Sequence, residues 1–486
     1  LDKAGNEQES LVVGTSSNAF ICDRTPPLSG VSVPNQQWTN QLSTISGTAL
    51  DPESPYNAGV NGGESKVELV IYRLVGSTTE YFTPSLTWST SRSTVNALAV
   101  SGSDFSSWYY DGIATKWTTD LKYTIETYAR DKIGNQQITP GVFTVIYDTT
   151  PPVSKINYPS NDAKLNSLSQ ITGTAVGPLS GVSDVYLKIW YLTAGTSNYW
   201  TGSTWSTNLS TVTVTSFIAS TWTYTTSVNW ETGYRHYINV YSKDNATNLE
   251  SPGDTIYFLY DSTAPTVAIS TPLAGGFYGP ANPLNTIYGN ANDPGSNPSG
   301  LSRVEIQISS DTSYWHPGIN QWVVGSSSWI VVNGTDTWNY TTGNIWVDGK
   351  EFKVEARSFD KALNQSTTAQ AIFLYDTTLP LSRIQLPTPS KEYYKSGELP
   401  LISGTAFDVG SGKHSEIEKI EIALQENPES NYYWYGSSFS ATGMSWRLTS
   451  YSSPTWQYPA GGESLPGWTD GTKYRIYARA QDRAQN

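Results

Sequence analysis

Aspartate and asparagine recur along this chain in a pattern that could bind metal ions. Four predicted strands end in a segment of the form Asp-x-x-x-Asn, and four further aspartates each begin a segment rich in Thr and Pro. Hard cations such as Ca²⁺ prefer several carboxylate and carbonyl oxygens, which two adjoining domains could supply together. The candidate ligands are Asp131, Asn135, Asp148, Asp244, Asn248, Asp261, Asp360, Asn364 and Asp376. The Asp-x-Asp-x-Asp-Gly spacing of a calcium loop is absent, so plain turn and capping roles explain these residues as well.

Pairs of adjacent aromatic residues, each followed shortly by a tryptophan, are a second recurring group. An exposed indole can stack on a sugar ring, which would make the chain adhesive. The candidate glycan-binding residues are Trp200, Trp205, Trp315, Trp322, Trp434 and Trp446. Cross-strand packing within a hairpin explains the same recurrence, because the pairs stand at one place in every repeat. A separate set, Trp108, Trp222, Trp338 and Trp456, shares one strand position and is predicted to lie in cores.

Residues for catalysis are not indicated. An enzyme needs a nucleophile with a base, or paired carboxylates in a concave site. The three histidines, His236, His316 and His414, stand at different places relative to the recurring segments, and we expect them on the surface. Glu416 and Glu418 alternate on one strand face, where we expect them to be solvated. The sequence therefore favours a protein that is not an enzyme.

Composition narrows the classes of partner. The 486 residues carry a net charge of −13 and show no cluster of Lys and Arg, so nucleic acid is not an expected partner. A single cysteine, Cys22, excludes an internal disulfide framework and a zinc site built on cysteines. No run of about twenty apolar residues is present to span a bilayer. Aromatic residues make up 13% of the chain and charged residues only 15%, which favours pleated strands over helices.

Four segments recur in a fixed order and define the period of the chain. The Thr/Pro-rich linkers begin at Asp23, Asp148, Asp261 and Asp376. A strand centred on glycine follows each linker, as ISGTA at 45–49, ITGTA at 171–175, IYGNA at 287–291 and ISGTA at 402–406. An alternating apolar strand comes next, and a further strand closes in each Asp-x-x-x-Asn turn. The order predicts repeats over 24–148, 149–261, 262–376 and 377–486.

Short strands separated by turn residues, with no helical stretch, predict an all-β chain of tandem immunoglobulin-like (fibronectin type III-like) β-sandwich domains joined end to end. The ordered motifs, including Asp148-Thr-Thr-Pro-Pro152 and the Ser180-Gly181-Val182 turn, resemble the bacterial immunoglobulin-like repeats of large cell-surface adhesins. The resemblance covers nearly the whole chain. It implies an extracellular, cell-surface rod that carries a binding tip or bridges cells and matrix.

The two ends of the chain fall at the same place in the repeat. Leu1–Asn6 matches Gln481–Asn486, so residues 1–23 are predicted to close a preceding domain, and residues 377–486 lack their last strand. Either the array continues beyond this sequence, or residues 7–23 of one subunit complete the sheet of another by strand addition. The predicted partners are therefore further repeats or copies of the same chain.

Two functions follow from these observations. The first is a structural stalk or filament-forming segment of an extracellular surface protein, with Ca²⁺ as the one candidate cofactor. The alternative is an adhesive module that binds a cell-surface or matrix glycan through the tyrosine and tryptophan hairpins.

Overall fold

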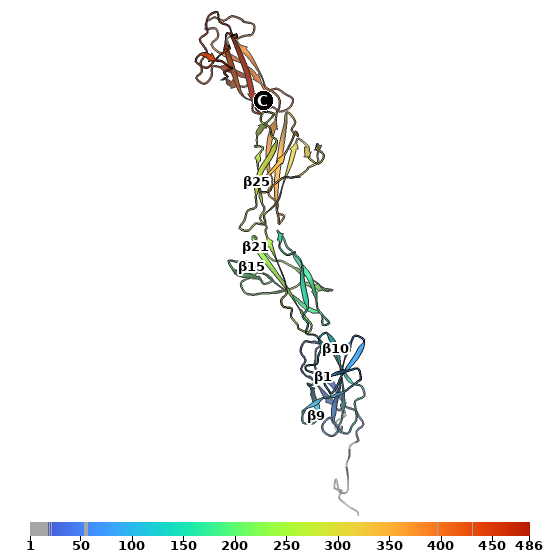
Figure 1. The fold of residues 1–486 in the computed structure, drawn as a ribbon. Coiled ribbons are helices and arrows are strands. Elements are labelled where there is room, and N and C mark those ends of the chain that lie inside the picture. The colour runs from blue at the N-terminus through green and yellow to red at the C-terminus, as the bar shows by residue number, and fades with distance from the viewer. Residues whose placement is uncertain (1–17, 19, 21, 53–56, 396, 430) are drawn as a thin grey trace, which may run out of the picture. The chain divides into compact units, whose positions relative to one another are not determined.

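The computed structural model describes residues 18, 20, 22–52, 57–395, 397–429 and 431–486, which form strands, turns and loops but no helix (Figure 1). The chain divides into two compact units. The first ends at Leu259 and the second begins at Tyr260, apart from segments 164–167 and 231–233, which group with the second unit. Within the described residues there is no helix long and apolar enough to cross a membrane.

The first unit contains two repeats, each built from two facing β-sheets. The strands of the first repeat are β1 (Leu28–Val33), β2 (Trp38–Thr39), β3 (Ile45–Leu50), β4 (Lys66–Val75), β5 (Thr78–Phe82), β6 (Trp88–Ser89), β7 (Val95–Asn96), β8 (Leu98–Ser101), β9 (Asp104–Tyr110), β10 (Leu121–Arg130) and β11 (Gly141–Tyr147). The strands of the second repeat are β12 (Val153–Tyr158), β13 (Ala163–Leu165), β14 (Gln170–Val176), β15 (Val182–Thr193), β16 (Thr196–Trp200), β17 (Trp205–Ser206), β18 (Val212–Thr213), β19 (Ser216–Ile218), β20 (Thr221–Thr225), β21 (Tyr234–Asp244) and β22 (Asp254–Tyr260).

The second unit contains two more repeats. The strands of the third repeat are β23 (Thr266–Thr271), β24 (Gly276–Tyr278), β25 (Thr286–Asn292), β26 (Leu301–Ser310), β27 (Ser313–His316), β28 (Gln321–Val324), β29 (Ile330–Val331), β30 (Thr337–Thr341), β31 (Lys350–Asp360) and β32 (Ala369–Tyr375). The strands of the fourth repeat are β33 (Leu381–Leu386), β34 (Ile402–Phe407), β35 (Ile417–Glu426), β36 (Tyr432–Trp434), β37 (Phe439–Ala441), β38 (Arg447–Leu448), β39 (Ser450–Ser452), β40 (Thr455–Tyr458) and β41 (Tyr474–Asp482).

The first repeat shows a topology that the second repeat shares fully and the third and fourth share in part. One sheet has the order β1-β3-β9-β8, and the other has the order β2-β11-β10-β4-β5-β6. Pairing is antiparallel except between β2 and β11, which run parallel. Inward side chains of β10 alternate with outward ones, so Ile125, Thr127 and Ala129 are fully buried. The predicted sandwich class is confirmed.

A glycine and a tryptophan meet at the centre of every core. The glycines of the second recurring segment lie directly opposite tryptophans on the neighbouring strand: Gly47 and Trp108, Gly173 and Trp222, Gly289 and Trp338, Gly404 and Trp456. All four tryptophans are fully buried, as predicted. A Cβ at any of these glycines would overlap both the indole and a backbone carbonyl oxygen of the adjacent strand. The motif therefore requires glycine for close packing.

In the described residues, the fourth repeat lacks a strand equivalent to β11 of the first repeat. Its strand β41 pairs with β35, and among the described residues no strand pairs with its other edge, where β10 has β11. Ile476, Ala478 and Ala480 are only partly buried, although the matching side chains of β10 are fully buried. Among the described residues, this edge of the sheet is therefore unpaired, and the core beside it is incompletely covered. The predicted closing strand at 1–23 lies mostly outside the described residues.

Candidate functional site

The four Asp-x-x-x-Asn segments that end strands β10, β21, β31 and β41 each form a turn closed by the aspartate side chain. In the first repeat, Asp131 accepts a hydrogen bond from the backbone N–H of Asn135 at 2.8 Å and one from its side-chain amide at 2.7 Å. The same two bonds recur in every repeat between the turn aspartates and turn asparagines, which are Asp131 and Asn135, Asp244 and Asn248, Asp360 and Asn364, Asp482 and Asn486. The turn aspartates are 0–1% exposed. These bonds orient each asparagine amide for a further contact.

That further contact is with the aspartate that begins each linker. The amide of Asn248 donates to the backbone carbonyl of Asp148 at 2.8 Å. The carboxylate of Asp148 accepts from the N–H of Thr150 at 2.9 Å and from the N–H of Ser180 at 3.3 Å. Equivalent bonds surround the other linker aspartates, Asp23, Asp261 and Asp376. We call each linker aspartate with these partners a joint.

Within each compact unit, a joint binds the repeat before it as well as the repeat after it. The N–H of Asp148 donates to the carbonyl of Thr39 in the first repeat, while its carboxylate and carbonyl bind the second repeat. The N–H of Asp376 likewise donates to the carbonyl of Tyr278, while its carboxylate binds the N–H of Ser415. Hydrogen bonds that involve a charged group and are shielded from water contribute roughly 1.5–3 kcal/mol each. The linker is therefore held on both sides.

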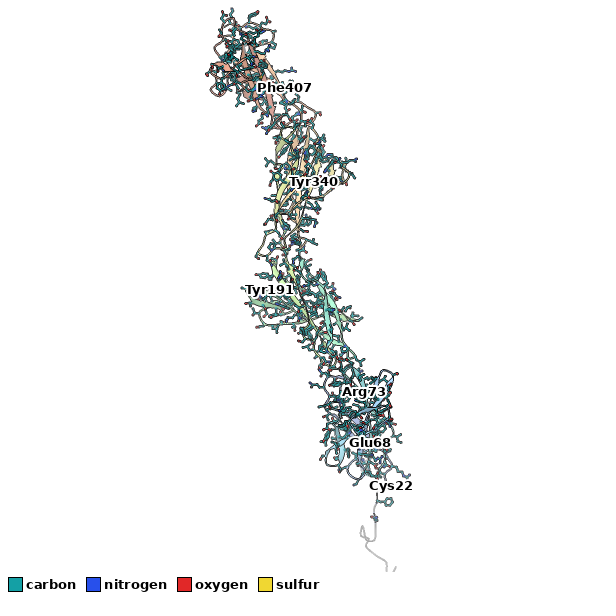
Figure 2. The ribbon with its side chains drawn as sticks, in the orientation of Figure 1. Cys22, Glu68, Arg73, Tyr191, Tyr340 and Phe407 are labelled. Carbon is teal, nitrogen blue, oxygen red and sulfur yellow. The ribbon has the colours of Figure 1, made fainter. Side chains whose placement is uncertain are left out.

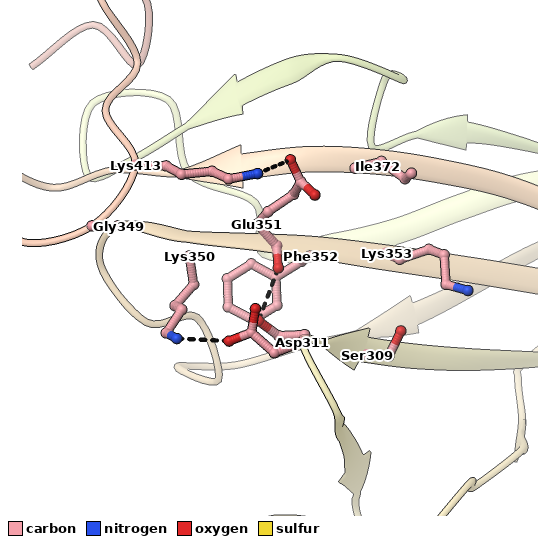
Figure 3. Close-up of a pocket in the computed structure, with 11 residues that line it drawn as sticks. Ser309, Asp311, Gly349, Lys350, Glu351, Phe352, Lys353, Ile372 and Lys413 are labelled. Carbon is pink, nitrogen blue, oxygen red and sulfur yellow. Dashed lines mark hydrogen bonds and ion pairs between the residues drawn. The ribbon is translucent and has the colours of Figure 1, made fainter. Parts of the chain in front are cut away.

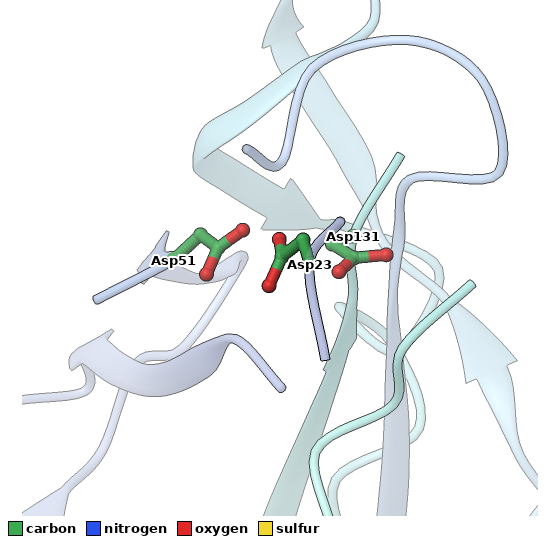
Figure 4. A group of neighbouring side chains, drawn as sticks. All are labelled: Asp23, Asp51 and Asp131. Carbon is green, nitrogen blue, oxygen red and sulfur yellow. The ribbon is translucent and has the colours of Figure 1, made fainter. Parts of the chain in front are cut away.

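A third aspartate completes three of the four joints. Asp51, Asp293 and Asp408 each stand two residues after the Gly-x-Ala segment. Three groups bring carboxylate oxygens within 4.8 Å of one another: Asp23, Asp51 and Asp131 (Figure 4); Asp261, Asp293 and Asp360; Asp376, Asp408 and Asp482. Asp51 is only 3% exposed, and its Oδ1 has no hydrogen-bond partner among the described residues. Oxygens of Asp293 and Asp408 are buried without partners in the same way. The carboxylate of the third aspartate thus has fewer hydrogen-bond partners than the carboxylates of the linker and turn aspartates.

Crowding of carboxylates shifts their protonation. Burial raises the pKa of Asp51, and the nearby Asp23 and Asp131 carboxylates raise it further. Burial together with Asp376 and Asp482 raises the pKa of Asp408 to about 6. Backbone N–H groups lower the pKa of Asp23 instead, so the linker carboxylate keeps its charge more readily. Three close carboxylates need either a proton or a cation among them.

The predicted ligands are therefore only part of the site. Of the nine, the structure brings Asp131, Asp261, Asp360 and Asp376 into carboxylate groups. The amides of Asn135, Asn248 and Asn364 donate to aspartates, so their nitrogens face the carboxylates. The third aspartates were missed, although their place after the Gly-x-Ala segment repeats three times.

The hairpin tryptophans pack within or against the cores. Trp200, Trp315 and Trp434 are 3–6% exposed, and each indole N–H donates to a tyrosine hydroxyl. The half-buried Trp205 and Trp322 donate to backbone carbonyls at 2.9 and 3.1 Å. Trp446 is covered by the guanidinium of Arg479, 4.1 Å from the ring centre. A sugar could reach the first three rings only by displacing the hairpin.

One expectation about histidine is wrong. His236 is fully buried, with Trp205, Trp230 and Phe258 around its ring. The matching strand positions hold Tyr123, Phe352 and Tyr474, so the histidine occupies an aromatic core position. The burial of His236 could not be predicted from the sequence, because period-2 alternation alone does not distinguish a buried from an exposed imidazole. His316 and His414 are half-buried.

A pocket in the third repeat and the single cysteine do not belong to the joints. A pocket at one end of β31 contains ion pairs between Lys413 and Glu351 at 2.6 Å and between Lys350 and Asp311 at 2.7 Å (Figure 3). These pairs satisfy opposite charges locally. Cys22 is exposed and forms no disulfide (Figure 2).

Comparisons with known proteins return only distant structural likenesses. No protein-family model matches the chain, and no curated protein matches its sequence. A crystal structure of a tetra-tandem repeat in the extending region of a large adhesion protein is 15% identical, with 95% of this chain and 96% of that chain covered and a TM-score of 0.33. The Clostridium thermocellum CbhA fibronectin(III)-like modules are 15% identical over 46% of this chain and 95% of theirs, with a TM-score of 0.25. At these scores the likenesses decide nothing about function.

Proposed function

We propose that this chain is a structural stalk segment of an extracellular surface protein and has no enzymatic activity. The joints carry the proposal, because the same set of hydrogen bonds fixes the linker aspartate at Asp23, Asp148, Asp261 and Asp376. A chain of independent domains would not need its linkers to be bonded to the domains on either side. Stiff joints between sandwiches make a spacer that resists bending.

Small-angle X-ray scattering on the full chain tests this proposal. Four sandwiches of about 35 Å each make a rod of about 140 Å with a radius of gyration of about 40 Å, whereas a compact chain of this length gives about 23 Å. Asn248→Ala removes the amide that binds both Asp148 and Asp244, and it should broaden the distribution of interdomain distances. The exposed Asn208, changed to Ala, is the matched control and should leave the distribution unchanged. A compact particle would refute the stalk.

We also propose that the joints bind divalent cations, with Ca²⁺ as the natural candidate. The carboxylate groups supply the hard oxygen ligands that Ca²⁺ prefers. The buried Oδ1 of Asp51, which has no hydrogen-bond partner among the described residues, supports a bound cation over a turn role alone, since a buried carboxylate oxygen without a partner is costly. A cation at the joint would stiffen the stalk further.

The free edge of β41 supports a third proposal, that a closing strand from another copy of the chain completes the fourth repeat. Residues 7–23 are the proposed donor, because Phe20-Ile21-Cys22-Asp23 matches Val145-Ile146-Tyr147-Asp148, where β11 closes the first repeat. Strand addition supplies backbone hydrogen bonds and covers exposed apolar side chains. Filaments would then form by repetition of this one contact, in which residues 7–23 of each subunit pair with β41 of the next.

Light scattering with a competing peptide tests this assembly. We expect the full chain under reducing conditions to form oligomers, and a synthetic peptide of residues 7–23 to break them into monomers. The peptide should also raise the melting temperature of the fourth repeat by several degrees, and a scrambled peptide should do neither. A strictly monomeric chain whose melting the peptide leaves unchanged would overturn the proposal.

A further inference from the structure

The second repeat has an unusually aromatic surface on the outer side of its larger sheet. Strands β15 and β21 lie side by side there (Figure 1), and their buried side chains alternate with side chains that point away from the core. Together with the adjoining β16 and β22, they carry six half-buried aromatic residues on this side: Tyr186, Trp190, Tyr199, Tyr237, Tyr241 and Tyr257. We call this surface the aromatic face.

Four of the rings form one row across four strands of the sheet. Tyr199 and Tyr237 stand directly opposite Trp190, with ring centroids 6.5 and 5.2 Å from that of the indole. Tyr257 continues the row, 6.0 Å from Tyr237. Neighbouring strands lie about 4.8 Å apart, so the row is about 14 Å long. An array of this length, with phenol hydroxyls and an indole N–H among its rings, fits an extended chain of polar units.

Two cations lie against rings of this row without a carboxylate partner. The ammonium of Lys188 is 5.0 Å from the centre of the Trp190 ring, and the guanidinium of Arg235 is 5.0 Å from that of Tyr257. Neither cation forms an ion pair within the described ranges of the chain. Contact with an aromatic ring positions a cation but does not neutralise its charge. The aromatic face thus presents two fixed positive charges.

Glutamate occupies one position of this face in each of the other repeats. Tyr186 stacks on Tyr241 of the neighbouring strand, with ring centroids 5.4 Å apart. The residues that match Tyr186 are Glu68, Glu305 and Glu421, and each of them forms an ion pair. The net charge of the chain is −13. A surface that keeps its cations but lacks this carboxylate is therefore suited to an anionic partner.

The chemistry of the aromatic face favours a sugar polymer among the possible anions. Nucleic-acid binding depends on clusters of Lys and Arg that replace the counterions of many phosphates, and two cations do not form such a cluster. A peptide commonly binds a sheet by adding a strand at an open edge, but β15 and β21 are paired on both sides. Sugar hydroxyls can bond the phenols and the indole N–H, and a sugar carboxylate can bond Lys or Arg.

We propose that the aromatic face of the second repeat binds an acidic polysaccharide. The row of rings contacts the sugar units, and Lys188 and Arg235 bond their carboxylates. The inference goes beyond the stalk function and rests on it in one respect, the extracellular location in which the chain would meet such a polymer. A stalk with this site would attach along its side to a polysaccharide matrix.

Biolayer interferometry on the full chain tests the proposal. The probes are polygalacturonate, alginate and hyaluronate, and methyl-esterified polygalacturonate serves as an uncharged probe with the same backbone. Chelator is present throughout, so that calcium cannot bridge carboxylates of the chain and the polymer. We expect saturable binding of at least one acidic polymer, weakened by added salt, and no binding of the esterified one.

Two variants locate the binding on the aromatic face. Tyr186→Glu introduces the residue of the other repeats, so it should fold, and its negative charge should weaken binding about tenfold or more. Lys188→Gln combined with Arg235→Gln should weaken binding to a similar extent. The matched control, Lys122→Gln with Lys473→Gln, removes two exposed cations at the place of Arg235 in the first and fourth repeats and should leave binding unchanged. Thermal melts check that each variant is folded.

Each other outcome would overturn the proposal. Absence of binding to all three acidic polymers would do so, as would equal binding of the esterified polymer or undiminished binding by both variants. Poly-glutamate or oligothymidylate bound as tightly as the sugars would refute the assignment to a polysaccharide. Scattering by the same chain still reports whether it is a rod, so failure of this site is distinguishable from failure of the stalk.

Discussion

Gly47→Ala is expected to lower the free energy of unfolding of the first repeat by about 3 kcal/mol, because overpacking at this site cannot be relieved by a side-chain rotation. The added methyl group would meet the Trp108 indole on one side and the carbonyl oxygen of Gly30 on the other. One of these neighbours is backbone in a paired strand, so the two strands would have to separate locally. Urea denaturation followed by tryptophan fluorescence measures the loss.

The control for this substitution lies on the adjoining strand. Gly30 is the glycine whose carbonyl crowds Gly47, yet a Cβ at Gly30 would have no atom within 4 Å. Gly30→Ala should therefore change the stability by no more than about 0.5 kcal/mol. Equal effects of the two substitutions would show that close packing against tryptophan is not the reason for the conserved spacing within the repeats.

In the absence of divalent cations, the fourth repeat is expected to have a lower free energy of unfolding at pH 7.5 than at pH 5. The pKa of Asp408 in the folded chain is raised to about 6 from an ordinary value of 3.8. A raised folded pKa means that the folded state favours the protonated carboxyl. That contribution to stability is complete below pH about 4 and is lost as pH rises through about 6. The raised pKa of Asp482 acts in the same direction.

Calcium should reverse this dependence, because it binds the carboxylate form that high pH favours. Calcium at 100 times its dissociation constant would stabilise a site by about 2.7 kcal/mol. Thermal melts in chelator and in excess Ca²⁺, at both pH values, measure the effect. Asp408→Asn should remove most of the pH dependence and the calcium response of the fourth repeat, whereas the exposed Asp470→Asn should retain both. Identical melting in calcium and chelator at pH 7.5 would contradict cation binding.

The sequence predicts the sandwich class well because each repeat carries the same local information. The alternation along β10 and the shared tryptophan position follow from the strand period, which requires no knowledge of distant contacts. The linker and turn aspartates were also recognised as related, since they recur in order.

What the sequence did not provide is which residues far apart along the chain come together within a repeat. Asp51 stands 80 residues before Asp131, and only the packing of β3 beside the turn after β10 brings the two carboxylates together. The burial of His236 was missed for a related reason: its surroundings come from β17, β22 and the loop at Trp230. Strand alternation could not decide whether the hairpin tryptophans are exposed to a glycan or packed across strands. The structure places Trp200, Trp315 and Trp434 in the cores.

The joint has a consequence for how such an array could change in length over evolution. Each repeat binds the linker aspartate of its predecessor in the same way: the turn asparagine donates to the carbonyl of that aspartate, and a backbone N–H donates to its carboxylate. Since every repeat both offers and accepts the same residue, a duplicated or deleted unit would leave matched ends at the new boundary. Recombination between repeats could therefore lengthen or shorten the array while keeping the bonds of the linker aspartate.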